Sequence, residues 1–375
     1  ALEYYAKAME GALPGTKVEV SLMPQDKSVE LSVLTLSKES DAYDVVWVND
    51  SVVQRFAKSG WLEPVDALWA KYKAQFALAD IPDSILASYR YQGKLYAIPF
   101  NTNVQFFFYR ADVFKEKGLK PPKTFDEYLK LAKALSGPGA AGTIMSLKPV
   151  DAALNETHWY MNAFGAKWFD DKWKPAFNSS QGVKAIETMK ALSAYAPRGF
   201  TSHANDESTV NLQQGLAMMG LQWASRAAAM DDPAKSRVVG KIEWAPPPGG
   251  GARLVTDAYA ISRFSKKDKD LTFRMLATAS NEESMRKAGG LLLPPRQKVL
   301  LDAELQKKYR HWPAALEAMK VDKAYPSLPE FTEVGETITR RVLQAVTGEA
   351  PVKTALDQAA AEVTEMLSKR GYYKN

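Results

Sequence analysis

The chain has 375 residues, of which 46% are hydrophobic and 25% charged, so it is long enough for two domains with sizeable cores. It contains no cysteine, which excludes disulfides, zinc–thiolate centres and cysteine nucleophiles. The formal net charge of +6 comes from scattered basic residues, which argues against a nucleic-acid-binding protein.

Metal and membrane sites are also not expected. The three histidines, His158, His203 and His311, lie far apart and have none of the spacings of a histidine metal site. The sequence therefore predicts neither a metal ion nor a cofactor. No apolar run is long enough for a membrane span. The first residues lack the basic and apolar regions of a signal peptide, as a mature, processed protein would.

Helices and strands alternate over the first hundred residues. Residues 1–13 predict a helix, and the alternating segment "KVEVSL" (residues 17–22) predicts a strand. The apolar run "YDVVWVN" (residues 43–49) is typical of a buried parallel strand. A short helix over residues 51–60 follows and is closed by Gly60. This order predicts a parallel sheet covered by helices.

The segment "GKLYAIPFNTNVQFFFYR" (residues 93–110) predicts two strands separated by a polar piece, residues 101–103. That piece is too short for a helical crossover. We expect Phe106, Phe107 and Phe108 to be buried core residues of the second strand.

A helix over residues 121–135 begins with a T-x-x-E capping box formed by Thr124 and Glu127. The remaining predictions are a loop over 137–142, a helix over 178–192, a break over 246–251, a strand over 254–262 and mostly helix from 269 onward.

Several segments, taken in order, resemble the extracellular solute-binding proteins of ABC importers, family 1, which bind carbohydrates. The segments are "YDVVWVNDSVVQRFAKSGWLEPVD", "YQGKLYAIPFNTNVQFFFYRADVFKEKGLKPPKTFDEYLKLAKAL" and "LQQGLAMMGLQW". In the C-terminal half, four further segments resemble the sorbitol/mannitol-type polyol binders of that family. They are "GAKWFDDKWKPAFNSSQGVKAI", "DDPAKSRVVGKIEWAPPP", "LLLPPRQKVLLD" and "LPEFTEVGETITRRVLQAVTGEAPVKTALDQA".

The resemblance implies an α/β, two-lobed periplasmic-binding-protein type II fold, with a ligand cleft between lobes joined by hinge crossovers. Lobe one would contain residues 1–103 plus 260–312, and lobe two residues 104–259 plus 313–375. The crossovers would lie near Asn101, Asp257 and His311. Members of the family open with a strand before the first helix, whereas this sequence begins in that helix. Ligand contacts from the loop after that strand are therefore absent from our site prediction.

A sugar or polyol presents hydroxyl groups, which suit Asp, Asn, Gln and Arg side chains, and a C–H surface, which suits an aromatic ring. The sequence is rich in such residues at predicted strand ends, where α/β sheets place their ligand sites. The resulting candidate ligand-binding residues are Asn49, Asp50, Ser51, Asn101, Asn103, Trp159, Trp223, Asp257 and Arg296.

Each candidate also has a structural interpretation. Asn49, Asp50 and Ser51 could cap the following helix. Asn101 and Asn103 could be turn residues, and Asp257 could make a hinge hydrogen bond, at a position where the family often has an aromatic residue. Trp159 and Trp223 could be core residues, as we expect of Trp168 and Tyr259. Arg296 could form a structural ion pair.

The predicted function is that of a periplasmic, monomeric solute-binding component of an ABC importer. It would capture a sugar or sugar alcohol by lobe closure and deliver it to the membrane-embedded permease, without a catalytic step. An alternative ligand is an anionic sugar derivative or a sugar–amino acid conjugate, suggested by the net charge and Arg296.

A carbohydrate-active enzyme is a distant alternative. Glycoside hydrolysis needs two carboxylates about 5 to 10 Å apart, and 43 acidic residues make some such pair unavoidable. The absence of a G-x-S-x-G motif and the resemblance argue against an enzyme.

Overall fold

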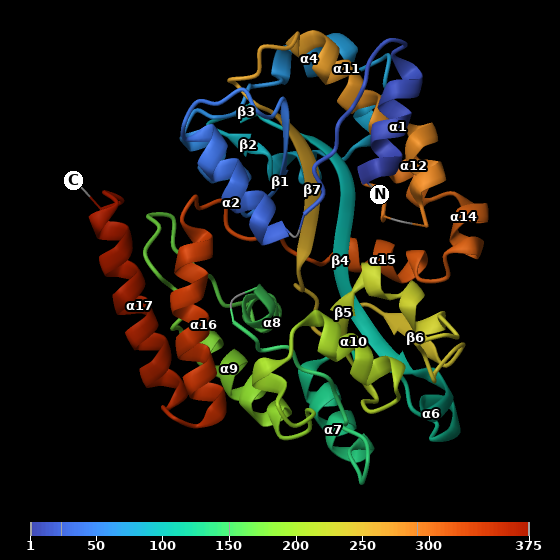
Figure 1. Cartoon of the computed structure of the whole chain (residues 1–375). Helices are drawn as coiled ribbons and strands as arrows, with labels where there is room; N and C mark the ends of the chain where they lie inside the picture. Colours follow the sequence, from blue (N-terminus) through green and yellow to red (C-terminus); the bar gives the residue numbers. More distant parts are fainter. Residues whose placement is uncertain (1, 24, 150, 291, 374–375) are drawn as a thin grey trace. The chain divides into compact units, whose positions relative to one another are not determined.

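The structure is a computed structural model that describes residues 2–23, 25–149, 151–290 and 292–373 (Figure 1). The chain divides into two compact units, each built from discontinuous segments. Unit 1 contains residues 1–103, 255–312 and 327–330, and unit 2 contains residues 104–254, 313–326 and 331–375.

These units differ from the lobe boundaries expected from the sequence in two places. Residues 255–259 belong to unit 1, because strand β7 (Leu254–Ile261) pairs with strand β1 (Val45–Asn49) of that unit. Residues 327–330 also belong to unit 1, where Glu330 forms an ion pair with Lys58 at 2.9 Å.

In unit 1, β1 and β7 run antiparallel in a register from Val45 opposite Ile261 to Asn49 opposite Asp257. The first half of strand β4 (Ile98–Arg110) is the next neighbour of β7 in the sheet order. The predicted parallel sheet is therefore wrong at β1, whose described partner, β7, runs antiparallel to it. A short hairpin joins β2 (Arg90–Tyr91) to β3 (Lys94–Leu95).

The predicted strand over residues 17–22 does not form either. Val20 and Leu22 alternate as strand residues would, but they are 39% and 54% exposed and this segment joins no ladder among the described residues. Alternation alone predicts a strand, but a strand also needs a pairing partner. The helix predicted over residues 1–13 is α1 (Leu2–Ala12), and Ala1 lies outside the described residues.

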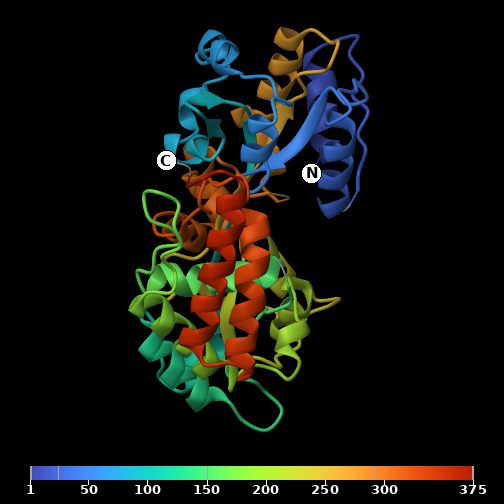
Figure 2. The ribbon, with the colours of Figure 1, turned by 90° about the vertical axis from the view of Figure 1, so that its left-hand side faces the viewer.

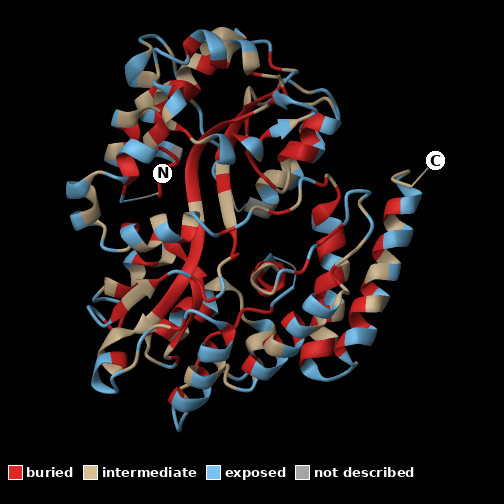
Figure 3. Ribbon diagram, turned by 180° about the vertical axis from the view of Figure 1, so that it is seen from behind, coloured by how far each residue is buried: buried red, intermediate tan, exposed pale blue. Residues whose placement is uncertain are grey.

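The polar piece over residues 101–103 is not a turn between two strands. It lies within β4, whose 13 residues run from unit 1 into unit 2, with the boundary after Asn103. Figure 3 shows that this strand is buried over most of its length. Phe106, Phe107 and Phe108 have no exposed surface, which confirms that they are core residues.

In unit 2, the second half of β4 is the central strand of a small antiparallel sheet. It pairs with β5 (Met219–Trp223) and with β6 (Ile242–Ala245). The long helices α16 (Phe331–Thr347) and α17 (Val352–Lys369) pack side by side at the C-terminal end of the chain (Figure 2).

The prediction of mostly helix from Lys269 onward is confirmed, whereas several of the other helices, such as the one over residues 25–36, were not predicted. The remaining helices of unit 1 are α2 (Gln25–Leu36), α3 (Val53–Lys58), α4 (Asp66–Tyr72), α5 (Asp83–Ala87), α11 (Lys269–Ala279), α12 (Glu282–Ala288), α13 (Gln297–Leu300) and α14 (Ala303–Lys308). Those of unit 2 are α6 (Ala111–Glu116), α7 (Phe125–Leu135), α8 (Asp151–Ala163), α9 (Ser180–Ser193), α10 (Asn205–Gln213) and nearly all of α15 (Trp312–Met319).

The predicted capping box of α7 is present. The Thr124 hydroxyl accepts the Glu127 N–H at 3.2 Å, and the Glu127 carboxylate accepts the Thr124 N–H at 3.4 Å. Two N–H groups that the first turn of a helix leaves unpaired are thus satisfied. The side chains of Phe125, Tyr128 and Leu135 of this helix are buried within unit 2.

Replacing Thr124 by Ala should lower the free energy of unfolding by about 1 kcal/mol, because the cap oxygen is lost. Urea unfolding followed by circular dichroism measures the change. Thr364→Ala is the matched control. Thr364 lies inside α17, where its hydroxyl bonds back to the Ala360 carbonyl, so Ala should be neutral or slightly stabilising there. Equal losses in both variants would contradict a capping role for Thr124.

Candidate ligand-binding site

Polar side chains gather where three neighbouring strands of unit 1 run side by side. Asn49 ends β1 and lies opposite Asp257 of β7. From β4, Asn101 donates its Nδ2–H to the Asp257 carboxylate, with 2.6 Å between Nδ2 and Oδ2. Unit 1 therefore brings together three of the residues that the sequence singled out. We call Asn49, Asn101 and Asp257 the amide–carboxylate cluster.

The hydrogen bond from Asn101 fixes the direction of the Asp257 carboxylate. Asn101 is 8% exposed, whereas Asp257 is partly exposed. An ionised carboxylate has about four acceptor sites, and the bond from Asn101 occupies one of them and orients the group. The cluster thus has the donors and acceptors that hydroxyl groups require.

The turn after β1 is held by Asn49 rather than by a helix cap. The Asn49 side-chain oxygen accepts the N–H of Ser51 at 3.0 Å and its hydroxyl at 2.6 Å. The N-cap residue of α3 is Val52, and it makes no side-chain cap bond. The capping interpretation of these residues is therefore wrong. Asp50 is buried within this turn, and Ser51 is half-buried.

Two further candidates lie where β4 crosses into unit 2 and at the end of β5. Asn103 is half-buried and is the last residue of unit 1 in this strand. Trp223 is the last residue of β5 and lies opposite Gln105 of β4. Its indole is 8% exposed and, among the described residues, does not pack against another aromatic ring. It differs in this respect from the tryptophans of the unit 2 core.

Trp159 belongs to that core, which corrects its prediction as a ligand contact. Its side chain is 1% exposed, and its indole N–H donates to the Pro248 carbonyl at 3.1 Å. The ring packs against Phe125 and Tyr128 at centroid distances of 4.8 and 5.8 Å. The expectation that Trp168 and Tyr259 are core residues is confirmed, because they are buried and their rings pack against Phe331 and Phe100 at 5.4 and 4.1 Å.

Arg296 is also a structural residue, and its prediction as a ligand contact is corrected by its partners. The side chain has no exposed surface, and its Nε–H donates to the Ser280 carbonyl at 2.5 Å. Its two terminal nitrogens donate to the carbonyls of Ala77 and Phe76, each at 2.8 Å.

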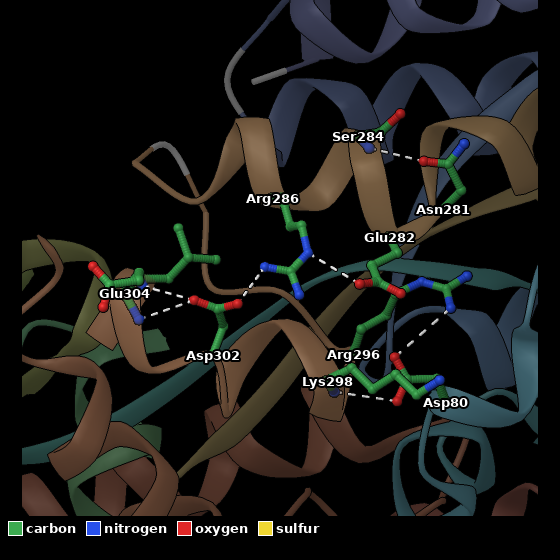
Figure 4. A network of polar contacts seen from close by, with 10 residues as sticks. Asp80, Asn281, Glu282, Ser284, Arg286, Arg296, Lys298, Asp302 and Glu304 are labelled. Atoms are coloured by element: carbon green, nitrogen blue, oxygen red, sulfur yellow. Dashed lines mark hydrogen bonds and ion pairs between the residues drawn. The ribbon is translucent and has the colours of Figure 1, made fainter. Parts of the chain in front are cut away.

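An Asp80 oxygen lies 3.9 Å from the Arg296 guanidinium, within the polar network of unit 1 shown in Figure 4. Burial lowers the pKa of Arg296, and the Asp80 charge opposes that effect. The guanidinium donors are thus used to hold the loop over residues 76–80.

The interior of unit 2 keeps several ionisable groups neutral. Burial raises the pKa of Glu156 to about 8 and lowers the pKa of His158 to about 3. Burial also raises the pKa of Asp322 well above its ordinary value. The His158 ring lies between the Trp168 indole N–H, 3.1 Å from Nδ1, and the Lys323 carbonyl, 3.0 Å from Nε2. A neutral imidazole with its proton on Nε2 satisfies both bonds.

A second polar chain in unit 2 was not predicted. The Arg253 guanidinium lies over the Tyr325 ring at 3.6 Å, and the Tyr325 hydroxyl donates to the Asn155 side-chain oxygen at 2.6 Å. No local sequence signal links Asn155 and Tyr325, which are 170 residues apart. Over the described ranges, His, Asp and Glu side chains form no group of three that could hold a metal ion. In the same part of the chain, no helix is both long and apolar enough to cross a membrane.

Comparison with known proteins places this geometry in a family. Residues 1–285 match the model of the bacterial extracellular solute-binding protein family. A mannitol-binding protein of Pseudomonas aeruginosa is 24% identical over 404 residues, covering 100% of this chain and 91% of the relative. A probable amino-acid ABC transporter periplasmic-binding protein of Sinorhizobium fredii is 30% identical over 317 residues, covering 80% of this chain and 70% of the relative.

Solved structures agree with the predicted fold. An ABC transporter solute-binding protein of Agrobacterium radiobacter in complex with ribitol superimposes with a TM-score of 0.86, at 23% identity, covering 97% of this chain and 95% of that protein. The likeness confirms the α/β periplasmic-binding-protein type II fold. The matching relatives are binding proteins, so the prediction that the chain is not an enzyme is confirmed. The chain belongs to the bacterial extracellular solute-binding protein family.

Proposed function

We propose that the protein is the periplasmic solute-binding component of an ABC importer and that its ligand is a linear sugar alcohol or a small neutral sugar. The mannitol-binding relative and the ribitol complex support this ligand class. We further propose that the protein works as a monomer, captures the ligand by closure of its two lobes and presents it to the permease.

The amide–carboxylate cluster is the observation that carries this proposal. In a linear polyol every carbon bears a hydroxyl, and each hydroxyl can donate one hydrogen bond and accept two. Asp257 accepts hydroxyl hydrogens, while Asn49 and Asn101 have amide groups that both donate and accept. A carboxylate beside the ligand also disfavours an anion, because like charges a few ångströms apart repel. The cluster therefore favours a neutral ligand rich in hydroxyl groups.

Trp223 is the residue of unit 2 that we propose for the C–H surface of the ligand. An indole ring offers a large apolar face at a low conformational cost, and Trp223 makes no aromatic contact that already occupies it among the described residues. Closure needs no more than a ligand that binds the closed state better than the open state.

An anionic sugar derivative or a sugar–amino acid conjugate is the second candidate ligand. The name of the Sinorhizobium fredii relative refers to amino acids, which supports this second candidate. Arg296, the residue that suggested this ligand class from the sequence, does not support it, because its side chain is buried and donates to three backbone carbonyls.

A thermal-shift screen tests the ligand class. The panel contains ribitol, mannitol, maltose, glucuronate, glutamate and an opine. A ligand at 100 times its dissociation constant stabilises the native state by about 2.7 kcal/mol. We expect a rise in melting temperature with ribitol or mannitol. A rise with glucuronate, glutamate or the opine alone would overturn the neutral polyol in favour of the second candidate.

Asp257→Asn should weaken binding of the best polyol by about 1–3 kcal/mol, the range for a hydrogen bond to a charged group. Titration calorimetry measures this change. Asp268→Asn is the matched control in the same unit. Asp268 caps α11 through the Leu271 N–H at 2.9 Å, and Asn caps a helix about as well as Asp. Unchanged affinity in Asp257→Asn would restrict Asp257 to a structural hydrogen bond with Asn101.

Trp223→Ala should also weaken polyol binding by about 1–3 kcal/mol, because an apolar contact face is removed. Trp223→Phe keeps an aromatic face and should recover part of the affinity. Calorimetry gives the affinities, and circular dichroism verifies that both variants are folded. If folded Trp223→Ala binds the polyol as tightly as the parent, Trp223 does not contact the ligand.

Arg296→Gln should lower the free energy of unfolding by about 3 kcal/mol, since a charged donor is lost from buried carbonyls, and should leave the ligand affinity unchanged. Urea unfolding and calorimetry separate the two effects. Unchanged stability together with a weakened ligand affinity would contradict the structural role and indicate that Arg296 contacts the ligand.

A further inference from the structure

A hairpin in unit 2 holds a tryptophan in a backbone conformation that favours glycine. Phe169 pairs with Pro175 in an antiparallel bridge, and the Trp173 N–H donates to the Asp170 carbonyl at 3.0 Å. Trp173 has a φ of 61°, in the left-handed region where hairpins with a type I turn usually place Gly. A bulky residue in this region is an outlier, and such strain persists where the surrounding structure enforces it, often at functional sites.

Contacts from two directions enforce this conformation. The Asp170 carboxylate accepts the N–H groups of Lys172 and Lys174 at 2.8 and 2.9 Å, and these bonds lower the pKa of Asp170. From the C-terminal end of the chain, the Tyr373 hydroxyl donates to the Trp173 carbonyl at 2.8 Å. The turn is thus fixed from within and from outside, which keeps the Trp173 ring in place.

The hairpin borders an open depression of about 470 Å³ in unit 2. Three aromatic side chains contribute to its wall, of which Trp173 is partly exposed while Trp168 and Phe169 are mostly buried. The rings of Phe169 and Trp173 meet at 5.7 Å and 63°. The complete lining is Asn162, Ala166, Lys167, Trp168, Phe169, Asp170, Asp171, Trp173 and Pro326.

Polar groups on this lining complement the aromatic wall. Lys167 and Asp171 are exposed, and neither side chain is engaged in an ion pair within the described residues. The Asn162 Nδ2–H donates to the Gly251 carbonyl at 3.0 Å, which leaves the amide oxygen of Asn162 as an acceptor. Lys167 carries a positive charge, whereas Asp170 and Asp171 carry negative charges, so the depression has donors and acceptors for hydroxyl groups and disfavours an anionic ligand.

We propose that this depression is a second ligand site, which takes a ring of a neutral saccharide. The partly exposed Trp173 face would lie against the C–H face of the ring, and Lys167, Asp171 and Asn162 would bind its hydroxyl groups. The site shares no residue with the amide–carboxylate cluster of unit 1. The proposed saccharide site can therefore be tested independently of the polyol site.

Trp173→Gly is the decisive variant, because Gly adopts the left-handed turn without strain. A tryptophan kept only for packing would make this variant less stable. We expect instead an unchanged or higher melting temperature, together with a loss of saccharide binding of at least 10-fold. Saturation-transfer difference NMR with methyl α-D-glucopyranoside and with maltose measures the binding.

Asp268→Asn is the control, since it changes only the cap of α11 in unit 1 and should leave the saccharide signal in place. Tyr373→Phe removes the hydroxyl bond to Trp173 and should weaken the signal without abolishing it. Three results would overturn the proposal: no saccharide signal in the parent protein, an undiminished signal in Trp173→Gly, or a signal that disappears in Asp257→Asn and persists in Trp173→Gly.

Discussion

Both units depend on the hydrogen bonds of one strand, β4. Its buried backbone groups must find partners along the whole strand. The Thr102 N–H donates to the Leu293 carbonyl at 2.7 Å in unit 1, and the Gln105 N–H donates to the Arg253 carbonyl at 3.0 Å in unit 2. Successive side chains of a strand alternate between its faces, so Asn101, Asn103 and Gln105 share one face. These three amides therefore lie on one face of the strand that continues from unit 1 into unit 2.

Local signals in the sequence were sufficient for much of the secondary structure. The capping box of Thr124 and Glu127 and the apolar run at Phe106 depend on neighbours within a few residues, and both predictions are confirmed. Strand pairing depends on distant partners instead. The register that sets Asn49 opposite Asp257 joins segments about two hundred residues apart, which no local period reveals. For that reason the antiparallel sheet and the unpaired segment over residues 17–22 were missed.

The candidate site shows the same limit at the level of side chains. Residue type identified groups able to bind a sugar, but it did not reveal which groups were already occupied. Arg296 donates to carbonyls 219 and 220 residues away, and the Trp159 N–H donates to one 89 residues away. Asn49, Asn101 and Asp257 come together because they lie on three strands that neighbour one another in the sheet order. The physical distinction is that the fold uses the donors of Arg296 and Trp159 for backbone carbonyls, which residue type alone does not reveal.

The carboxylate of the amide–carboxylate cluster is oriented before any ligand binds. A flexible carboxylate loses rotational freedom when a ligand orders it, and that loss reduces the affinity. The Asp257 carboxylate is already directed by the 2.6 Å bond from Asn101, on a strand that the fold keeps in place. Under the proposed function, a change of side chain at such strand positions would alter which hydroxyl or charge is recognised, while the backbone hydrogen bonds of β4 and β7 would remain. A single fold can thereby serve ligands as different as ribitol and maltose, the ligands of two structurally similar proteins.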